Sequence, residues 1–253
     1  MKKMIALLLA ALMICAMFTG CGEKGTTLKS VQKAGKLTIA TSPDFPPFES
    51  LGDNNEVVGI EIDVLNLICE QLGVTLEINQ MDFDSVLPGV QAGKFDVGVS
   101  GISVTEKRQK NVLFTDPYCL AAQAIVVTEG SSITCKADLE GKTVSVQTGT
   151  TAEEYCMENG YEVLAFAANN DAAAALTSGK AAAWVVDNEV GVALAQQQGL
   201  VVLDEAMTSE PYAFAFAKDS ALTAQFDEAL GELLADGTVA AIFEKYGVLY
   251  VAP

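Results

Sequence analysis

Three short stretches of the chain carry groups that suit the two charges of a zwitterion. Arg108 is a fixed cation whose planar guanidinium can hold a carboxylate through two hydrogen bonds. Gly149-Thr-Thr151 opens a helix after a strand, and the free N–H groups at a helix start favour an anion. Asp187 follows an apolar strand, where ligands of open α/β sheets bind, and its carboxylate would pair with an ammonium group. Together these residues predict a site for an α-amino acid.

Each of these residues also has a simpler structural interpretation. Arg108 lies in the polar run Thr105-Glu-Lys-Arg-Gln-Lys110 and could be a solvated helix charge. Asp187 could cap the helix that starts at Asn188. Gly149 and Thr150 could form only a strand-to-helix turn, in which Thr150 and Glu153 make a capping box. The elements around these residues must therefore decide whether they meet.

The composition excludes several classes of function. The chain has 253 residues, half of them apolar, which is enough for one large domain or two lobes with separate cores. Lys and Arg total 15 against 33 Asp and Glu, and the net charge of −18 argues against binding to nucleic acid or to anionic lipid through a basic face. The absence of histidine removes Ser-His-Asp triads, histidine metal sites and imidazole proton shuttles. We expect no metal and no cofactor.

The N-terminus has the pattern of a secretory signal. Lys2 and Lys3 precede an apolar run from Met4 to Phe18, which is too short to span a bilayer comfortably. Phe18-Thr-Gly-Cys21 resembles a bacterial lipobox, in which the cysteine is acylated and becomes the new N-terminus. We therefore expect residues 1–20 to be a lipoprotein signal peptide, Cys21 to carry the lipid, and residues 21–35 to form the anchor and tether.

The apolar pattern alternates between strands and helices in two successive series. From residue 36 it predicts strand, helix, strand, helix and strand at 36–41, 62–72, 74–78, 84–91 and 95–99. From residue 143 it predicts strands at 143–147, 181–186 and 200–203, with helices starting at 150, at 169 and after 187. This order is typical of open, mostly parallel sheets. The expected fold class is α/β, with two Rossmann-like lobes.

Two extended segments between the series predict the connections between these lobes. The segments span 118–127 and 211–217, so the chain would leave the first lobe near Cys119 and return near Tyr212. We expect lobe one at 36–119 and 212–253, and lobe two at 120–211. The four cysteines after Cys21 (Cys69, Cys119, Cys135 and Cys156) show no C-x-x-C spacing. The sequence does not decide whether Cys135 and Cys156 form a disulfide.

Five stretches, taken in order along the chain, resemble one known family. They are Ala40-Thr-Ser-Pro-Asp-Phe-Pro-Pro-Phe-Glu49, Gly59-Ile-Glu-Ile-Asp63, Met81-Asp-Phe-Asp84, Gly101-Ile-Ser-Val-Thr-Glu-Lys-Arg108 and the helices from Gly231 to Gly247. Almost the whole mature chain resembles the polar amino acid branch of the bacterial extracellular solute-binding proteins, family 3. The resemblance implies the type II periplasmic-binding fold, with two lobes on two hinge strands. It also implies an extracytoplasmic protein that closes on an amino acid and delivers it to an ABC importer.

The same resemblance implies further contacts to the ligand. Phe45 and Phe83 match positions whose rings cover the ligand side chain, and Ser42 and Gln147 match positions that tune the side-chain preference. Some relatives carry an acid at the first tuning position and a lysine at the second. Neither residue occurs here, which favours a neutral polar or small apolar ligand, the neutral polar kind first. The expected ligand-binding residues are Ser42, Phe45, Phe83, Ser100, Gly101, Ser103, Arg108, Gln147, Thr150, Thr151 and Asp187.

The main competing class is an enzyme. Some dehydratases of cyclohexadienyl substrates share the implied fold, and they need a general acid or base in the cleft. Glu49, Glu189 and Glu210 are the candidate acids, but none lies in a motif for that chemistry. The zwitterion groups and the lipobox favour binding, so we expect no catalytic residue. The expected partners of a monomeric protein are a free amino acid, the membrane subunits of an ABC transporter and, through the acyl anchor, the lipid bilayer.

Overall fold

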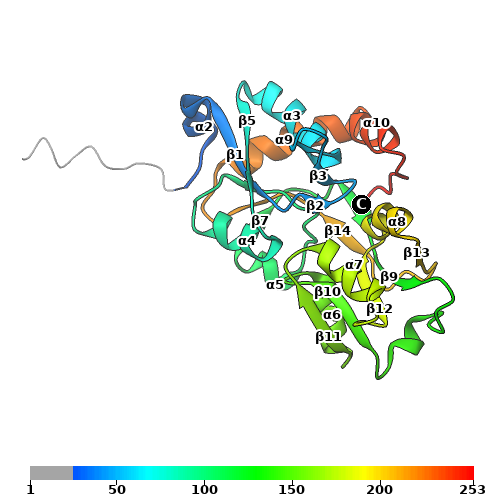
Figure 1. Ribbon diagram of the computed structural model, residues 1–253. Helices are drawn as coiled ribbons and strands as arrows, with labels where there is room; N and C mark the ends of the chain where they lie inside the picture. The colour runs from blue at the N-terminus through cyan, green and yellow to red at the C-terminus, as the bar shows by residue number, and fades with distance from the viewer. Residues whose placement is uncertain (1–24) are drawn as a thin grey trace, which may run out of the picture.

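The computed structural model describes residues 25–253, apart from the side chain of Gln197. The expected signal peptide at 1–20 and the expected acylation site Cys21 lie outside the described residues. Within the described range, no helix has the length and the apolar character needed to cross a bilayer. Two lobes, one above the other in Figure 1, are each built on a five-stranded sheet. The α/β architecture with two lobes, predicted from the sequence, is confirmed.

The first lobe contains a mixed sheet with the strand order β5-β1-β6-β15-β7. The strands are β1 (Lys36–Thr41), β5 (Thr75–Gln80), β6 (Val97–Gly98), β7 (Val112–Phe114) and β15 (Ala215–Ala217). Strand β1 runs parallel to β5 and β6, whereas β15, from the returning chain, is antiparallel to β6 and β7. The chain that returns from the second lobe therefore contributes a strand to the interior of this sheet.

Helices cover both faces of this sheet. They are α2 (Leu28–Ala34), α3 (Ile60–Leu72), α4 (Phe83–Gln91), α5 (Glu106–Gln109), α9 (Leu222–Ala235) and α10 (Thr238–Lys245). Leu37 and Ile39 belong to the core that α3, α9 and α10 complete, whereas Ala40 packs with Val86 of α4, because successive strand residues point to opposite faces. Helix α2 lies inside the range 21–35 that was expected to be anchor and tether, and its Val31 is part of the core.

A small antiparallel sheet extends from the end of β1. It consists of β2 (Asp44–Phe45), β3 (Glu49–Leu51) and β4 (Val57–Val58). Its first strand carries two neighbouring side chains, the half-buried Asp44 and the buried Phe45. This sheet therefore holds a carboxylate and an aromatic ring just beyond the end of β1.

The second lobe repeats the architecture with the strand order β11-β10-β12-β9-β13. Its elements are β9 (Gln123–Thr128), the 3-10 helix η1 (Lys136–Leu139), β10 (Thr143–Gln147), α6 (Thr151–Glu158), β11 (Glu162–Phe166), α7 (Asn169–Thr177), β12 (Ala183–Asp187), α8 (Asn188–Gln198) and β13 (Leu200–Val202). Cys135 and Cys156 are both free thiols, so the disulfide left open by the sequence is not formed. Burial of Cys156 in the core of this lobe raises the pKa of its thiol to about 12.

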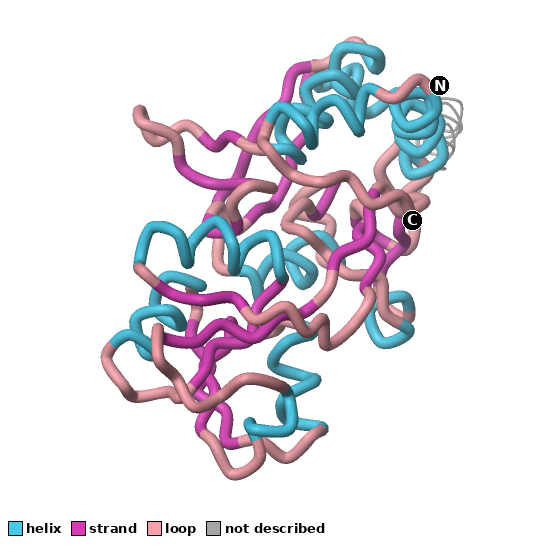
Figure 2. The backbone as a smooth tube through the Cα atoms, turned by 90° about the vertical axis from the view of Figure 1, so that its right-hand side faces the viewer, coloured by secondary structure: helices cyan, strands magenta, loops and turns pink. Residues whose placement is uncertain are grey.

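The lobes are joined by a two-stranded antiparallel ribbon, β8 (Cys119–Ala121) with β14 (Glu210–Tyr212). Figure 2 shows the same division from the side, with the C-terminus beside the connecting strands. There the backbone N–H of Leu120 donates to the carbonyl of Val251. The chain therefore passes between the two five-stranded sheets through this ribbon.

Candidate interlobe binding site

Most of the sequence-predicted residues meet where the two lobes face each other. Strand β1 leads into Ser42, β10 ends at Gln147 and β12 ends at Asp187, while the loop after β6 carries Ser103. Carboxyl ends of strands form the ligand-binding edge of open α/β sheets. Side chains of lobe one hydrogen-bond to lobe two in two separate groups, so the lobes are closed on each other. We call these groups the Arg108 network (Ser103, Arg108, Thr151 and Glu210, with Asp187 close enough to interact with the charges of Arg108 and Glu210) and the Asp44 network (Ser42, Asp44, Gln147, Asn169).

Arg108 is the only arginine in the sequence, and it lies between the lobes rather than in solvent. Its Nη1 donates to the carbonyl of Ser103 at 2.9 Å, and its Nη2 donates across the lobes to the carbonyl of Gly149 at 3.1 Å. The guanidinium carbon lies 5.5 Å from the centre of the Phe83 ring. Because the guanidinium has further N–H groups, this arrangement can still bind a carboxylate. Burial lowers the pKa of Arg108 from its ordinary value, and the nearby Glu210 and Asp187 raise it.

Asp187 stands at the N-cap position of α8, but its side chain makes no capping hydrogen bond. Instead the hydroxyl of Tyr212, on the connecting ribbon, donates to the Asp187 carboxylate. Burial and the neighbouring Glu210 raise the pKa of Asp187 to about 7, although Tyr212, Gln123 and Arg108 lower it. The simple helix-cap interpretation therefore does not account for this carboxylate, which is suited to a cationic group.

The two predicted threonines at the start of α6 make different hydrogen bonds. Thr150 Oγ1 accepts from the Glu153 N–H at 3.2 Å and donates to the Gln147 carbonyl at 2.7 Å, so this hydroxyl caps the helix. The Glu153 carboxylate reaches the N–H of Gly149 instead of that of Thr150, so the capping box is displaced by one residue. Thr151 Oγ1 points to the ribbon and donates to Glu210 at 2.6 Å. Neither hydroxyl has a proton left for a ligand carboxylate.

The aromatic wall lies on the first lobe. Phe45 and Phe83 are buried to 5% and 9% exposure, and the Phe45 ring packs against Gly101. Gly101 has φ of +51°, and a Cβ there would lie 2.2 Å from a Phe45 ring carbon. Glycine is therefore required at this position by both the backbone conformation and the ring.

The two predicted serines near Gly101 differ in orientation. Ser100 accepts from the backbone N–H of Ser42 at 3.1 Å and donates to Glu49 at 2.8 Å, so its hydroxyl is used inside lobe one. Ser103 donates its hydroxyl to Glu210 at 2.6 Å, while its carbonyl accepts from Arg108. The structure therefore brings Ser103 into the interlobe site and turns the Ser100 side chain away from it.

The Asp44 network surrounds one carboxylate with neutral donors. Asp44 Oδ1 accepts from the Ser42 hydroxyl at 2.8 Å. Its Oδ2 accepts from Gln147 Nε2 at 3.0 Å and from the N–H of Asn169, the first residue of α7, at 2.7 Å. The Asn169 side chain in turn donates to Gln147 Oε1 at 2.9 Å. The predicted tuning residues Ser42 and Gln147 thus both hold Asp44, which the sequence analysis did not select.

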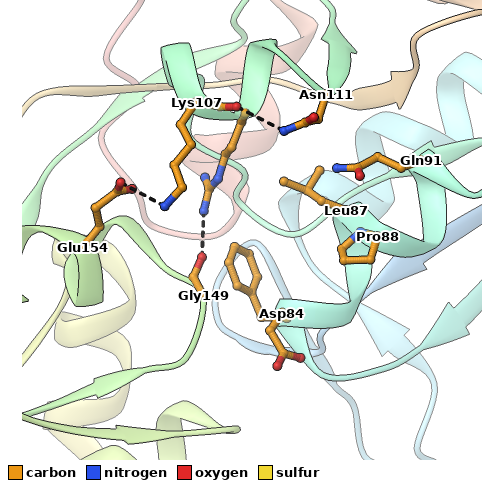
Figure 3. A pocket seen from close by; sticks show the side chains of 10 residues that line it. Asp84, Leu87, Pro88, Gln91, Lys107, Asn111, Gly149 and Glu154 are labelled. Atoms are coloured by element: carbon orange, nitrogen blue, oxygen red, sulfur yellow. Dashed lines mark hydrogen bonds and ion pairs between the residues drawn. The ribbon is translucent and has the colours of Figure 1, made fainter.

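A cavity of about 220 Å³ opens beside Arg108 between α4, α5 and lobe two. Lys107 and Glu154 both line it, and Figure 3 shows the two side chains directed toward each other; their charged atoms lie 3.1 Å apart. Both Lys107 and Glu154 are exposed, and they belong to different lobes. Among residues 25–253, no cluster of acids and cysteines is arranged to hold a metal ion.

The comparison with known families decides the class of protein. A model of the bacterial extracellular solute-binding proteins, family 3, matches residues 37–248. The chain belongs to this family. The arginine-binding extracellular protein ArtP of Bacillus subtilis is 32% identical over 255 residues, covering 97% of this chain and 98% of ArtP. The arginine-bound form of truncated ArgBP from T. maritima has a TM-score of 0.78 at 38% identity and covers 81% of this chain and 99% of its own.

A third similar structure bears on the enzyme alternative for this family 3 protein. It is the ancestral amino acid-binding protein AncCDT-1, described as a precursor of cyclohexadienyl dehydratase, with a TM-score of 0.81, 34% identity and coverage of 87% and 99%. The three candidate acids here already have other partners. Glu49 is fully buried behind Ser100, Glu189 bonds the Asn188 side chain, and Glu210 accepts three hydroxyls. Burial and the neighbouring Glu61 raise the pKa of Glu49 well above its ordinary value.

Asp44, Asn169 and Glu210 lie in the two networks but are absent from the ligand-binding residues predicted from the sequence. Asp44 lies in the turn after the first strand, two residues from Ser42, and that spacing is the one signal for it in the sequence. Glu210 was considered only as an acid for catalysis. Its position beside Thr151 depends on how the connecting ribbon crosses the lobes, which no local pattern encodes.

Proposed function

We propose that this protein captures an amino acid between its two lobes and delivers it to the membrane subunits of an ABC importer. The observation that carries the proposal is that Arg108 of lobe one and Asp187 of lobe two lie at the interface between the lobes, close enough for their opposite charges to interact. The guanidinium would bind the α-carboxylate at two points, and the Asp187 carboxylate would receive the α-ammonium. The expected lipid anchor at Cys21 would keep the protein at the outer surface of the cell membrane, next to the importer.

Lobe closure supplies the mechanism. Arg108 belongs to lobe one and Asp187 to lobe two, so one zwitterion would contact both lobes at once. Closure excludes water and strengthens each charge pair, because the effective dielectric constant falls. The ligand therefore shifts the population towards the closed state, which the importer can distinguish from the open one.

The charge pattern favours a cationic amino acid. A zwitterion would pair with Arg108 and Asp187, one charge of each sign. The carboxylates of Asp44 and Glu210 would then have no cationic partner in the ligand. Within residues 25–253 neither of these two acids forms an ion pair. A ligand with a positively charged side chain would offset one of them, in line with relatives named for arginine binding. The comparisons give no support to the neutral polar preference derived from Ser42 and Gln147.

Asp44 is the counter-ion we assign to that side chain. Its carboxylate lies in a network apart from Arg108, next to Phe45, whose ring would cover the alkyl part of the ligand. A carboxylate offers about four acceptor positions, and three are used by Ser42, Gln147 and Asn169. The remaining position can receive a guanidinium or an ammonium group.

A thermal melt panel tests the proposal. The protein is unfolded and refolded to remove carried-over ligand and is then melted with arginine, lysine, ornithine, glutamine, serine and glutamate. A ligand at 100 times its dissociation constant stabilises the folded state by about 2.7 kcal/mol. We expect the largest upward shifts for the cationic group. A panel without any shift would refute amino acid binding, and a shift with glutamine or serine alone would refute the cationic preference.

A further inference from the structure

Glu210 occupies a position between both lobes that ligand chemistry alone does not explain. It lies on strand β14 of the connecting ribbon and is 9% exposed. Its Oε2 accepts from Ser103 Oγ of lobe one and from Thr151 Oγ1 of lobe two, each at 2.6 Å. Its Oε1 accepts from Thr208 Oγ1 at 2.8 Å, and Thr208 in turn accepts from the backbone N–H of Gln123. A single carboxylate therefore accepts hydrogen bonds from three hydroxyls.

The protons of these hydroxyls can be assigned from the partners. A carboxylate only accepts hydrogen bonds, whereas each hydroxyl carries a single proton and two lone pairs. Ser103 and Thr151 must therefore direct their protons to Glu210. Thr151 also accepts from Gln123 Nε2 at 3.2 Å, which uses one of its lone pairs. Ser103 Oγ thus faces the interlobe site as an acceptor, because its only proton is already bound.

The charges around Ser103 also favour a cationic ligand group, as its acceptor role does. Glu210 is close enough to Asp187 and Arg108 to influence both, and its negative charge favours a cation at the Asp187 side of the site. The hydroxyl of Tyr212, two residues along the same ribbon strand, donates to Asp187. The ribbon therefore places the carboxylate of Glu210 near the ammonium pole and directs the Tyr212 proton to Asp187.

We propose that Glu210 is a positioning residue for ligand binding: it takes the hydroxyl proton of Ser103, so that Ser103 meets the ligand as an acceptor and selects for an α-ammonium group. The same Glu210 oxygen bonds Thr151, so the arrangement is complete only when the lobes are closed. This inference rests on the proposed amino acid binding and adds to it the origin of α-amino selectivity.

Two ligands and a mutant cycle test it. Calorimetric titrations compare L-arginine with its des-amino analogue δ-guanidinovalerate, which keeps the carboxylate and the guanidinium but lacks the ammonium. If the melt panel selects another amino acid, that amino acid and its own des-amino form are used. The variants are Glu210→Gln, Ser103→Ala, the double variant, and Glu189→Gln, a half-buried carboxyl of lobe two outside both networks.

We expect Glu210→Gln to weaken arginine binding by about tenfold to hundredfold and analogue binding by less than about threefold. The reason is that the hydrogen bond between Ser103 and the charged α-ammonium exists only with arginine and is the bond that the substitution weakens. Ser103→Ala should reduce the same selectivity ratio, and the double variant should be little worse than either single one. Glu189→Gln should leave the ratio unchanged.

Three results separate the possible failures. If the wild-type protein binds arginine but Glu210→Gln keeps the wild-type ratio, the positioning role is refuted and the proposed function stands. If the effects of Glu210→Gln and Ser103→Ala multiply, Glu210 acts by its charge alone and not through Ser103, which also refutes the proposal. If the wild-type protein binds no amino acid, the proposed function fails and this inference fails with it.

Discussion

The two networks between the lobes differ in the charges that they contain. The Arg108 network combines a guanidinium with the carboxylates of Asp187 and Glu210, and its bonds run through side chains, backbone and the connecting ribbon. The Asp44 network has one carboxylate and only neutral donors around it. The first matches the charges that every α-amino acid shares, and the second matches a single charge that only some side chains carry. Under the proposed function, the first network would recognise the class of ligand and the second would choose the member.

The largest effect is expected from Arg108→Ala. Removing one partner of a buried, hydrogen-bonded charge pair costs about 2–5 kcal/mol, so we expect arginine affinity to fall by about hundredfold or more. The effect should be similar for every amino acid that binds, because the carboxylate is common to all. Titration calorimetry with arginine and a second amino acid measures this. A loss confined to one of them would show that the Arg108 network does not recognise the class.

Asp187→Asn should have the next largest effect, about tenfold to hundredfold, and it should change the pH dependence. The pKa of Asp187 is raised to about 7, so below about pH 7 the ligand-free closed protein holds a proton there that an ammonium must displace. Arginine affinity should therefore fall as the pH is lowered below about 7. The contribution of Asp187 to the stability of the ligand-free protein has the opposite sign: it decreases as the pH rises from its unfolded-state pKa towards 7.

Titrations at several pH values in wild type and Asp187→Asn check this sign. The asparagine variant should lose the dependence on pH in this window. A wild-type affinity that stays constant between pH 5 and 8 would contradict the role assigned to Asp187.

Asp44→Asn tests whether the Asp44 network selects ligands with a cationic side chain. Asparagine keeps the size of the side chain but removes the charge, so arginine affinity should fall by about tenfold while affinity for glutamine changes by less than about threefold. Asp53→Asn, on the exposed turn between β3 and β4, is the matched control. Equal losses for arginine and glutamine would mean that Asp44 holds the lobes together without selecting the ligand.

The smallest effect is expected from Lys107→Ala, a residue that lines the cavity. Its ion pair with Glu154 joins the lobes, but both side chains are exposed, and such pairs contribute little. Arginine affinity should change by less than about threefold, and the change should vanish at high salt. A loss as large as that of Asp44→Asn would show that this exposed ion pair controls closure.

The sequence predicted the fold and the Arg108 network better than the Asp44 network, for a physical reason. Strand and helix periodicity gave the two lobes and placed Asp187 at a strand end, and the charges of a zwitterion singled out Arg108. Asp44 could not be selected in this way, because a carboxylate in a turn normally faces solvent. Its role depends on α7 of the opposite lobe, whose first residue donates to it across the lobes.

The orientations of the serine and threonine side chains could not be predicted from the sequence either. Ser100 and Ser103 lie in the same loop, yet one bonds inside lobe one and the other bonds the ribbon. Thr150 and Thr151 are adjacent, yet the first caps α6 and the second meets Glu210. A hydroxyl chooses its partner from what the tertiary structure brings within about 3 Å, and local patterns do not encode that choice.

One calorimetric comparison tests the central claim, that the Arg108 network binds the α-amino acid group as a zwitterion. The refolded, ligand-stripped protein is titrated with L-arginine and with agmatine, which is arginine without its carboxylate. We predict micromolar binding of arginine, corresponding to about −8 kcal/mol, and binding of agmatine that is weaker by about hundredfold or more. Equal affinity for the two ligands, or no binding of any amino acid, would contradict the account.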